Sequence, residues 1–187
     1  MRTLLALIIA LLAFSHEAEA FRLRLNGMVT DHGTQQPLAS ARVRIYKDGV
    51  IQRVLITNGA GKYSISLENQ GAYVIRVDAP GHQGKCITVD THGMEWEGDG
   101  RTSNLEIEMR LPAFRDGIDL SFFDLPLGMA YFEPATGLTR WSVKYERSIT
   151  ADVLELMADY DQHYPGLLQP TAGIRTELSS YLVLHGR

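Results

Sequence analysis

Six consecutive residues, Glu95-Trp-Glu-Gly-Asp-Gly100, form the segment of this sequence best suited to binding a ligand. Three carboxylates lie within five positions, and oxygen ligands of this kind hold Ca²⁺ in proteins. Trp96 could stack on a sugar ring, because an aromatic side chain presents an apolar face. The spacing is not that of an EF-hand, so the alternative is a solvated acidic loop with Trp96 held against the edge of the protein. The candidate ligand-binding residues are Glu95, Trp96, Glu97 and Asp99.

The other residues with catalytic or metal-binding chemistry do not form a recognisable site. The six histidines are scattered and lack the H-E-x-x-H spacing of zinc enzymes. His82 follows Pro80-Gly81, where we expect it to pack in a turn, and His92 beside Asp90 is expected to be solvated. No serine lies in the G-x-S-x-G elbow of a hydrolase. We therefore expect no catalytic residue, no metal and no cofactor.

The first twenty residues have the pattern of a secretory signal peptide. Arg2 supplies the positive start, residues 4–14 are apolar, and Ala18-Glu-Ala20 is a cleavage site of the A-x-A type. The apolar run is too short for a membrane-spanning helix, although a retained N-terminal anchor is the alternative. We expect residues 1–20 to be removed and the mature protein to be periplasmic, secreted or on the cell surface, with no transmembrane segment.

Composition and charge exclude several classes of protein. Of the 187 residues, 45% are hydrophobic and 21% charged, as in an ordinary globular protein. The net charge of −4 and the absence of a basic run argue against a nucleic-acid partner. Cys86 is the sole cysteine, so an intramolecular disulfide is impossible and burial as a small hydrophobic residue is expected. The fold must therefore be held by its core.

Seven short segments between residues 21 and 111 alternate apolar and polar side chains with a period of two. This alternation is typical of strands with one buried face. Turn-forming residues such as Asn58-Gly59 and Pro80-Gly81 separate the segments, and no helical pattern intervenes. The sequence predicts an all-β fold, a sandwich of two antiparallel sheets with seven strands. The expected strands are 21–29, 41–45, 50–56, 63–67, 73–79, 85–89 and 105–111.

The chain changes character after Pro112. Residues 112–147 are rich in aromatic and apolar side chains, and we expect them to form a hairpin packed on the sandwich, with Trp141, Val143 and Tyr145 on one face. Within residues 148–187 we expect a short helix, capped by Ser148 or Thr150 and ending near residue 164, then a tail with little pattern beyond the apolar patch 181–184.

Five motifs follow one another in the first part of the chain. With them, residues 22–111 resemble the carboxypeptidase-regulatory-like domain, a transthyretin-like (prealbumin-like) seven-stranded Greek-key sandwich with a carbohydrate-binding-like fold. The resemblance implies a non-catalytic module. The segment from Phe122 to Tyr145 also resembles an extension found in envelope proteins of Bacteroidetes-like bacteria. The motifs are Gly27-Met-Val-Thr-Asp31, Pro37-Leu-Ala-Ser-Ala-Arg-Val43, Thr57-Asn-Gly-Ala-Gly-Lys-Tyr63, Gly71-Ala-Tyr-Val-Ile75 and Ala79-Pro-Gly-His-Gln-Gly-Lys85.

Two functional hypotheses follow from these observations. The first is an exported, non-catalytic interaction module that binds an envelope protein, a glycan or another envelope polymer. The alternative is a small hydrolase or metal-dependent enzyme whose site is built from distant loops. The missing catalytic motifs favour the first hypothesis, although a fold does not by itself fix a function.

Overall fold

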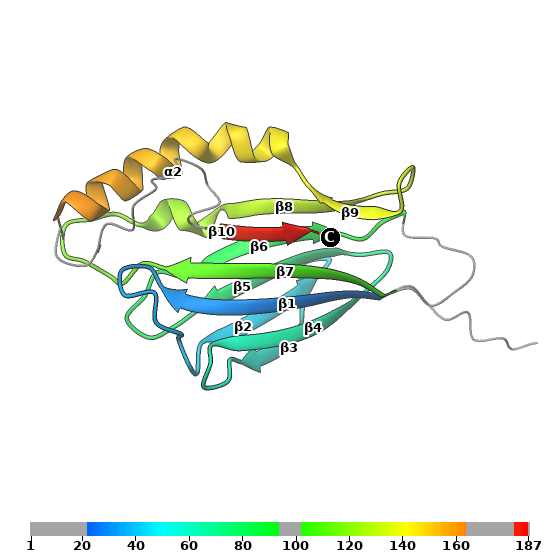
Figure 1. Ribbon diagram of the computed structural model, residues 1–187, viewed down its shortest axis with the longest axis horizontal. Coiled ribbons are helices and arrows are strands. Elements are labelled where there is room, and N and C mark those ends of the chain that lie inside the picture. The colour runs from blue at the N-terminus through cyan, green and yellow to red at the C-terminus, as the bar shows by residue number, and fades with distance from the viewer. Residues whose placement is uncertain (1–21, 94–101, 164–181, 187) are drawn as a thin grey trace, which may run out of the picture.

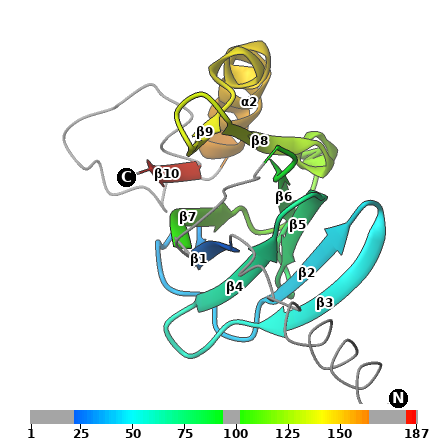
Figure 2. The ribbon, with the colours of Figure 1, turned by 90° about the vertical axis from the view of Figure 1, so that its right-hand side faces the viewer.

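The chain folds into two stacked β-sheets, which Figure 1 and Figure 2 show from two sides. The computed structural model describes residues 22–93, 102–163 and 182–186. The smaller sheet has the strand order β10-β7-β1-β4, and the larger sheet has the order β3-β2-β5-β6-β8-β9. The strands are β1 (Arg22–Asp31), β2 (Arg42–Lys47), β3 (Val50–Ile56), β4 (Lys62–Glu68), β5 (Ala72–Asp78), β6 (Lys85–Asp90), β7 (Thr102–Leu111), β8 (Pro126–Glu133), β9 (Leu138–Trp141) and β10 (Leu182–Gly186).

The core forms between the inner faces of the two sheets. Strand β4 alternates exposed and buried residues along its whole length, and β5 buries every second side chain. Leu25 of the smaller sheet and Ile75 of the larger sheet are both fully buried. This alternation confirms the predicted all-β sandwich, because a period of two places all the apolar residues of a strand on one face.

The strand pairings differ in two places from those of purely antiparallel sheets. Strand β1 pairs with β4 in antiparallel and with β7 in parallel orientation, which places Leu25 between Ile65 and Leu105. The chain crosses from β6 in the larger sheet to β7 in the smaller one, so β7 is not the hairpin partner of its predecessor. Strand β8 is likewise parallel to β6. The described residues form ten strands: the seven expected in the sandwich, β8 and β9 where a hairpin was expected, and β10, which was not expected.

The apolar segment after Pro112 extends the larger sheet. A 3₁₀ helix, η1 (Ser121–Asp124), precedes β8, which pairs with β6, and β9 pairs with β8. Phe123 is fully buried, and Leu127 and Phe132 also belong to the core. Residues 182–186, expected to be part of a tail with little pattern, instead form β10 on the edge of the smaller sheet.

The helix α2 (Val143–His163) begins earlier than the sequence suggested. Val143 and Tyr145 therefore belong to the helix and not to the hairpin. Ser142 occupies the capping position: its Oγ accepts a hydrogen bond from the Tyr145 amide at 3.3 Å. The two residues expected as caps lie inside the helix, where the Ser148 hydroxyl donates to the Tyr145 carbonyl at 2.6 Å and the Thr150 hydroxyl to that of Glu146 at 2.7 Å.

Helix α2 lies alongside β8 and adds its apolar stripe to the core (Figure 1). The Tyr145 hydroxyl donates to the Pro126 carbonyl at 2.7 Å, and the Tyr160 hydroxyl donates to the Ala113 carbonyl at 3.0 Å. These two bonds attach the first turn of the helix to β8 and its C-terminal part to the segment that follows β7. No helix in the described part of the chain is long and apolar enough to cross a membrane. The stripe consists of Ile149, Val153, Met157 and Tyr160.

Candidate functional site

The four residues that the sequence singled out for ligand binding lie outside the described residues. Glu95, Trp96, Glu97 and Asp99 belong to the segment between β6 and β7 for which no structure is described. Their role stays a prediction. The candidate site must therefore be sought on the surfaces that the described residues form.

On the outer face of the larger sheet, side chains from several strands meet. The pairing registers align Val74 of β5, Thr88 of β6 and Met129 of β8 in one cross-strand row. A second row next to it contains Asp90 and Tyr131. Met129 is 38% exposed and Tyr131 is 40% exposed, although both are large apolar side chains. Residues more than fifty positions apart are thus brought onto one surface.

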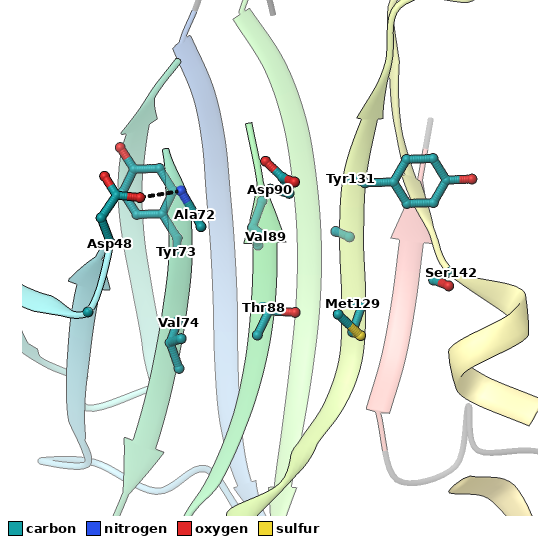
Figure 3. A pocket seen from close by; sticks show the side chains of 12 residues that line it. Asp48, Ala72, Tyr73, Val74, Thr88, Val89, Asp90, Met129, Tyr131 and Ser142 are labelled. Carbon is teal, nitrogen blue, oxygen red and sulfur yellow. Dashed lines mark hydrogen bonds between the residues drawn. The ribbon is translucent and has the colours of Figure 1, made fainter. Parts of the chain in front are cut away.

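A groove of about 540 Å³ lies over these rows, and we call it the sheet groove. Its lining is mainly apolar and includes Val74 and Met129, while Tyr131 stands at one side (Figure 3). Asp48 and Asp90 place two carboxylates on the lining. Asp48 is held in place because its Oδ1 accepts a hydrogen bond from the Ala72 amide at 2.9 Å. An apolar floor with a few fixed polar groups is the usual composition of a binding groove.

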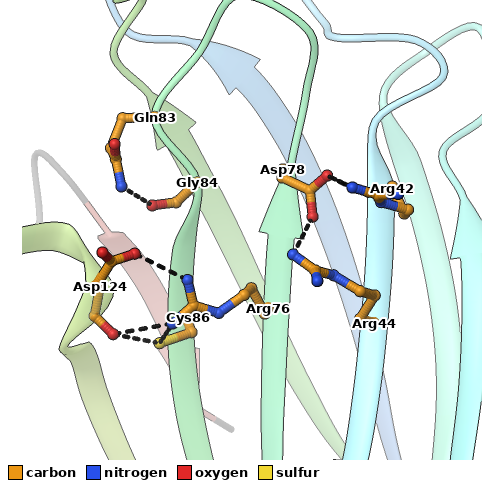
Figure 4. A network of polar contacts seen from close by, with 8 residues as sticks. All are labelled: Arg42, Arg44, Arg76, Asp78, Gln83, Gly84, Cys86 and Asp124. Atoms are coloured by element: carbon orange, nitrogen blue, oxygen red, sulfur yellow. Dashed lines mark hydrogen bonds and ion pairs between the residues drawn. The ribbon is translucent and has the colours of Figure 1, made fainter. Parts of the chain in front are cut away.

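A network of arginine–aspartate pairs lies on the same face, toward the other end of β5. Arg42 and Arg44 both bind Asp78, with N–O distances of 2.8 and 2.7 Å, and Arg76 binds Asp124 at 3.0 Å (Figure 4). Three arginines thus share two carboxylates, which leaves one net positive charge in this network. The carboxylates of the sheet groove, Asp48 and Asp90, lie toward the opposite end of β5, near Ala72.

Cys86 lies beneath this network and is 2% exposed. Its Sγ is 3.8 Å from Nη2 of Arg76 and 3.6 Å from the Asp124 carbonyl oxygen. Burial raises the pKa of the Cys86 thiol, while Arg76 acts in the opposite direction. A buried thiol with a raised pKa is a poor nucleophile.

His82 contacts Asp31 and so joins the loop between β5 and β6 to the end of β1. The distance from Nε2 to Oδ2 is 2.8 Å, and Nδ1 is 2.9 Å from the Pro80 carbonyl oxygen. Both neighbours are hydrogen-bond acceptors, to which the imidazole can donate from a ring nitrogen that carries a proton. Burial acts to raise the pKa of the Asp31 carboxyl, but hydrogen bonds from Thr34 and His82 outweigh it and lower that pKa.

A second histidine–aspartate pair connects the end of β1 with α2. His32 is 7% exposed and its Nε2 lies 3.3 Å from Oδ1 of Asp161. The Tyr160 ring contacts the His32 ring edge-on at a centroid distance of 5.9 Å. Both pairs therefore join segments far apart in the sequence. In the first pair, Asp31 lies between the Thr34 hydroxyl and the imidazole, so His82 is not placed to take a proton from that hydroxyl.

Lys85 is a buried amine that sequence reasoning passed over. It occupies an inward position of β6 and is 1% exposed, with Nζ 4.3 Å from the centre of the Phe123 ring. Burial lowers the pKa of Lys85 to about 7, and the positive charge of Arg110 acts in the same direction. The sequence does contain a signal for this burial, because Lys85 lies two residues before Ile87 and four before Val89, on the face of the strand that those residues bury. Enclosed in this way, Lys85 cannot contact a ligand from solvent.

Within the described ranges, no three histidine, cysteine, aspartate or glutamate side chains converge as metal ligands would. We take the sheet groove as the candidate binding site, because it combines a mainly apolar lining with Asp48 and Asp90.

Comparisons with known proteins identify the domain but no activity. Residues 24–109 match the family model of the carboxypeptidase regulatory-like domain. No curated protein matches the chain. Among solved structures, a Bacteroides fragilis protein of unknown function is 18% identical over 53% of this chain and 30% of its own, with a TM-score of 0.38. Catechol 1,2-dioxygenase from Acinetobacter sp. ADP1 is 15% identical over 56% of this chain and 57% of its own, with a TM-score of 0.37.

The Bacillus anthracis TIE protein is 14% identical over 50% of this chain and 17% of its own, with a TM-score of 0.40. The chain thus spans less than two thirds of the length of each of these three structures. At these identities and TM-scores, neither an activity nor a ligand transfers to this chain.

Proposed function

Because residues 24–109 of this chain match the family model of the carboxypeptidase regulatory-like domain, we propose that the protein is an exported, non-catalytic binding module of the bacterial envelope. Its partner is a protein segment that places an apolar side chain and a neighbouring basic group in the sheet groove. Export rests on the signal-peptide pattern of residues 1–20.

The observation that carries the proposal is the sheet groove itself. A groove of about 540 Å³ is large enough for two or three side chains of a partner. Its floor includes Val74 and Met129, so an apolar side chain would be removed from water there. Asp48 and Asp90 add two carboxylates, which favour a partner with lysine or arginine beside its apolar residue.

The state of the titratable groups supports a non-catalytic role. His82 and His32 each face an aspartate and join separate segments of the fold. His92 contacts Asp90 on the surface, and both side chains are more than half exposed. A general base needs a nucleophile or substrate proton within reach, and the rings of His82 and His92 contact Asp31, the Pro80 carbonyl and Asp90 and not a hydroxyl or thiol group. Cys86 and Lys85 are enclosed.

A capture experiment with one substituted position tests the proposal. The mature chain, beginning at residue 21, is immobilised and incubated with a detergent extract of the envelope proteins and, separately, with purified envelope glycans. Met129→Lys places a positive charge in the groove, which should repel the basic group and occupy the space of the apolar one. Ala151→Lys adds the same charge at an exposed position of α2 and serves as the control.

We expect the wild type and Ala151→Lys to retain the same envelope protein, and Met129→Lys to lose it. Retention of glycans instead of protein would contradict the proposed partner class. Retention of the same protein by Met129→Lys would contradict the groove as the site. About one zinc per chain in the purified protein, together with hydrolytic activity, would overturn the non-catalytic role.

A further inference from the structure

Strand β3 is an edge strand with an unusual surface. It ends the larger sheet on the side away from α2, and Figure 1 shows it at the margin of the molecule. Within the described residues, β3 pairs with β2 only. Val50, Ile51, Val54 and Ile56 of this strand are all between 49% and 62% exposed. An apolar edge with unpaired backbone groups favours the addition of another strand.

Two other edges of the sandwich lack this property. The solvent-facing side chains of β4 are polar or charged, for example Lys62 and Glu68. Strand β9 has only four residues, and its Arg140 forms an ion pair with Glu133 at 2.7 Å. Natural sheets protect their edges by shortness and by charge, and these two strands do so. Strand β3 has seven residues with Arg53 as its single charge.

An extra residue in β3 interrupts the regular alternation of its side chains between the two faces of the sheet. Val54 lies opposite Arg44 and Ile51 lies opposite Tyr46, while Gln52 has no partner on β2. This irregularity is a β-bulge. Because Arg44 and Tyr46 are on the outer face of the sheet, Ile51 and Val54 both point outward although three positions separate them.

The same bulge places Val50 and Leu55 on the inner side of the sheet. Val50 pairs with Lys47 and Leu55 pairs with Val43, which is fully buried in the core. Leu55 packs against the core and Val50 continues its row toward the turn. Beside the bulge, each half of β3 therefore presents one outward and one inward apolar side chain, and Ile56 adds a further outward one at the end of the strand.

This arrangement makes β3 complementary to itself. In an antiparallel pair centred between Gln52 and Arg53, Ile51 lies opposite Val54 of a second copy, and Val50 lies opposite Leu55. Both pairs have matched faces, as direct cross-strand neighbours must. If the two-fold axis passed through Arg53 instead, that arginine would lie opposite Arg53 of the second copy. The outward Ile51 would then lie opposite the inward Leu55, so the faces of the two side chains would not match. Sterics and charge thus select the first register.

We propose that β3 is a homodimer interface, at which two copies of this chain pair β3 with β3 across a two-fold axis and join their larger sheets into one continuous sheet. A closed two-fold contact uses the same surface on both copies and leaves no further edge for polymerisation at β3. Six residues of each strand take part, which is less than a standard interface, so we expect a dissociation constant in the micromolar range.

Sedimentation velocity over a range of protein concentrations tests the association. The wild type should shift from monomer to dimer as its concentration rises to about 1 mM. Ile51→Lys places a charge at the centre of the interface and should raise the dissociation constant by at least about tenfold. Leu138→Lys makes the same change at an exposed apolar residue of the other edge, β9, and should leave the dimer intact. Urea midpoints of the variants check that each is folded.

Disulfide trapping tests the register. When Ile51→Cys and Val54→Cys proteins are mixed and oxidised, the mixed dimer should form faster than either dimer of identical copies. If only Val54→Cys proteins formed disulfide-linked dimers, the strand pair would be centred on Val54. If Ile51→Cys instead formed a disulfide with Leu55→Cys, the strand pair would be centred on Arg53. Either result would overturn the proposed register. A wild-type protein that stays monomeric at every concentration would overturn the proposed dimer. The same conclusion would hold if β3 of that monomer bound only an extended strand of another protein.

Discussion

Replacement of Lys85 by methionine should change how the stability of the protein depends on pH. Burial lowers the pKa of Lys85 to about 7 in the folded protein, from the value of 10.5 for an ordinary lysine. Between these two pH values the unfolded chain carries the Lys85 proton and the folded protein has lost it. Because the unfolded state then binds more protons, the free energy of unfolding rises with pH in this window.

The size of the effect follows from that difference in proton binding. One additional proton on the unfolded state gives a slope of about 1.4 kcal/mol per pH unit. Lys85 is still half protonated in the fold at pH 7, so the total gain between pH 7 and 9 is about 2 kcal/mol. The Phe123 face, 4.3 Å from Nζ, stabilises the charged form to some extent and keeps the gain from being larger. Methionine does not titrate, so this contribution is absent from Lys85→Met.

Urea unfolding at pH 7, 8 and 9 measures the effect as a difference between proteins. The wild type should gain about 2 kcal/mol over Lys85→Met across this range. Lys62→Met removes an exposed lysine of β4 and should follow the wild-type profile. Parallel profiles for wild type and Lys85→Met would refute the reasoning, because they would mean that Lys85 keeps its proton in the fold up to pH 9.

Three further predictions concern the turn, the C-terminal segment and export. Gly61→Ala should destabilise by about 1–3 kcal/mol, since its Cβ would lie 2.4 Å from the Val29 carbonyl oxygen at a φ of +69°. Gly49→Ala, at a φ of +81° in open space, should cost less, and equal urea midpoints would contradict the clash. Truncation after Leu111 removes η1, β8, β9, α2 and β10 and should lower the urea midpoint or the solubility sharply; an unchanged midpoint would make the segment a separate appendage. N-terminal sequencing of the exported protein should begin at Phe21, and an uncleaved N-terminus would refute the signal peptide.

The strands of the sandwich could be predicted because their signal is local. In β5, the residues Tyr73, Ile75 and Val77 are buried and their neighbours are not, as the alternation in the sequence indicates. The turn at Gly61 could also be predicted, since a positive φ favours glycine. The start of α2 could not: Ser142 caps it, but Ser148 and Thr150 are equally good capping residues on sequence grounds.

The candidate site could be predicted only in small part. The acidic segment around Trp96 was selected by residue type, and it lies outside the described residues. The sheet groove was missed because Val74, Thr88 and Met129 come from three strands that are distant in the sequence. No residue among them has a distinctive chemistry, so only their common position on one face reveals the groove.

The sequence by itself determined which residues face the core of this protein, because a period of two is a property of each strand alone. It also indicated the family, because the turn motifs occur in a fixed order. Tertiary structure decided which strands are neighbours, including the parallel placement of β7 beside β1 and of β8 beside β6. These pairings depend on free energies summed over the whole core, so they set the sheet groove and the β3 edge without leaving a local signal.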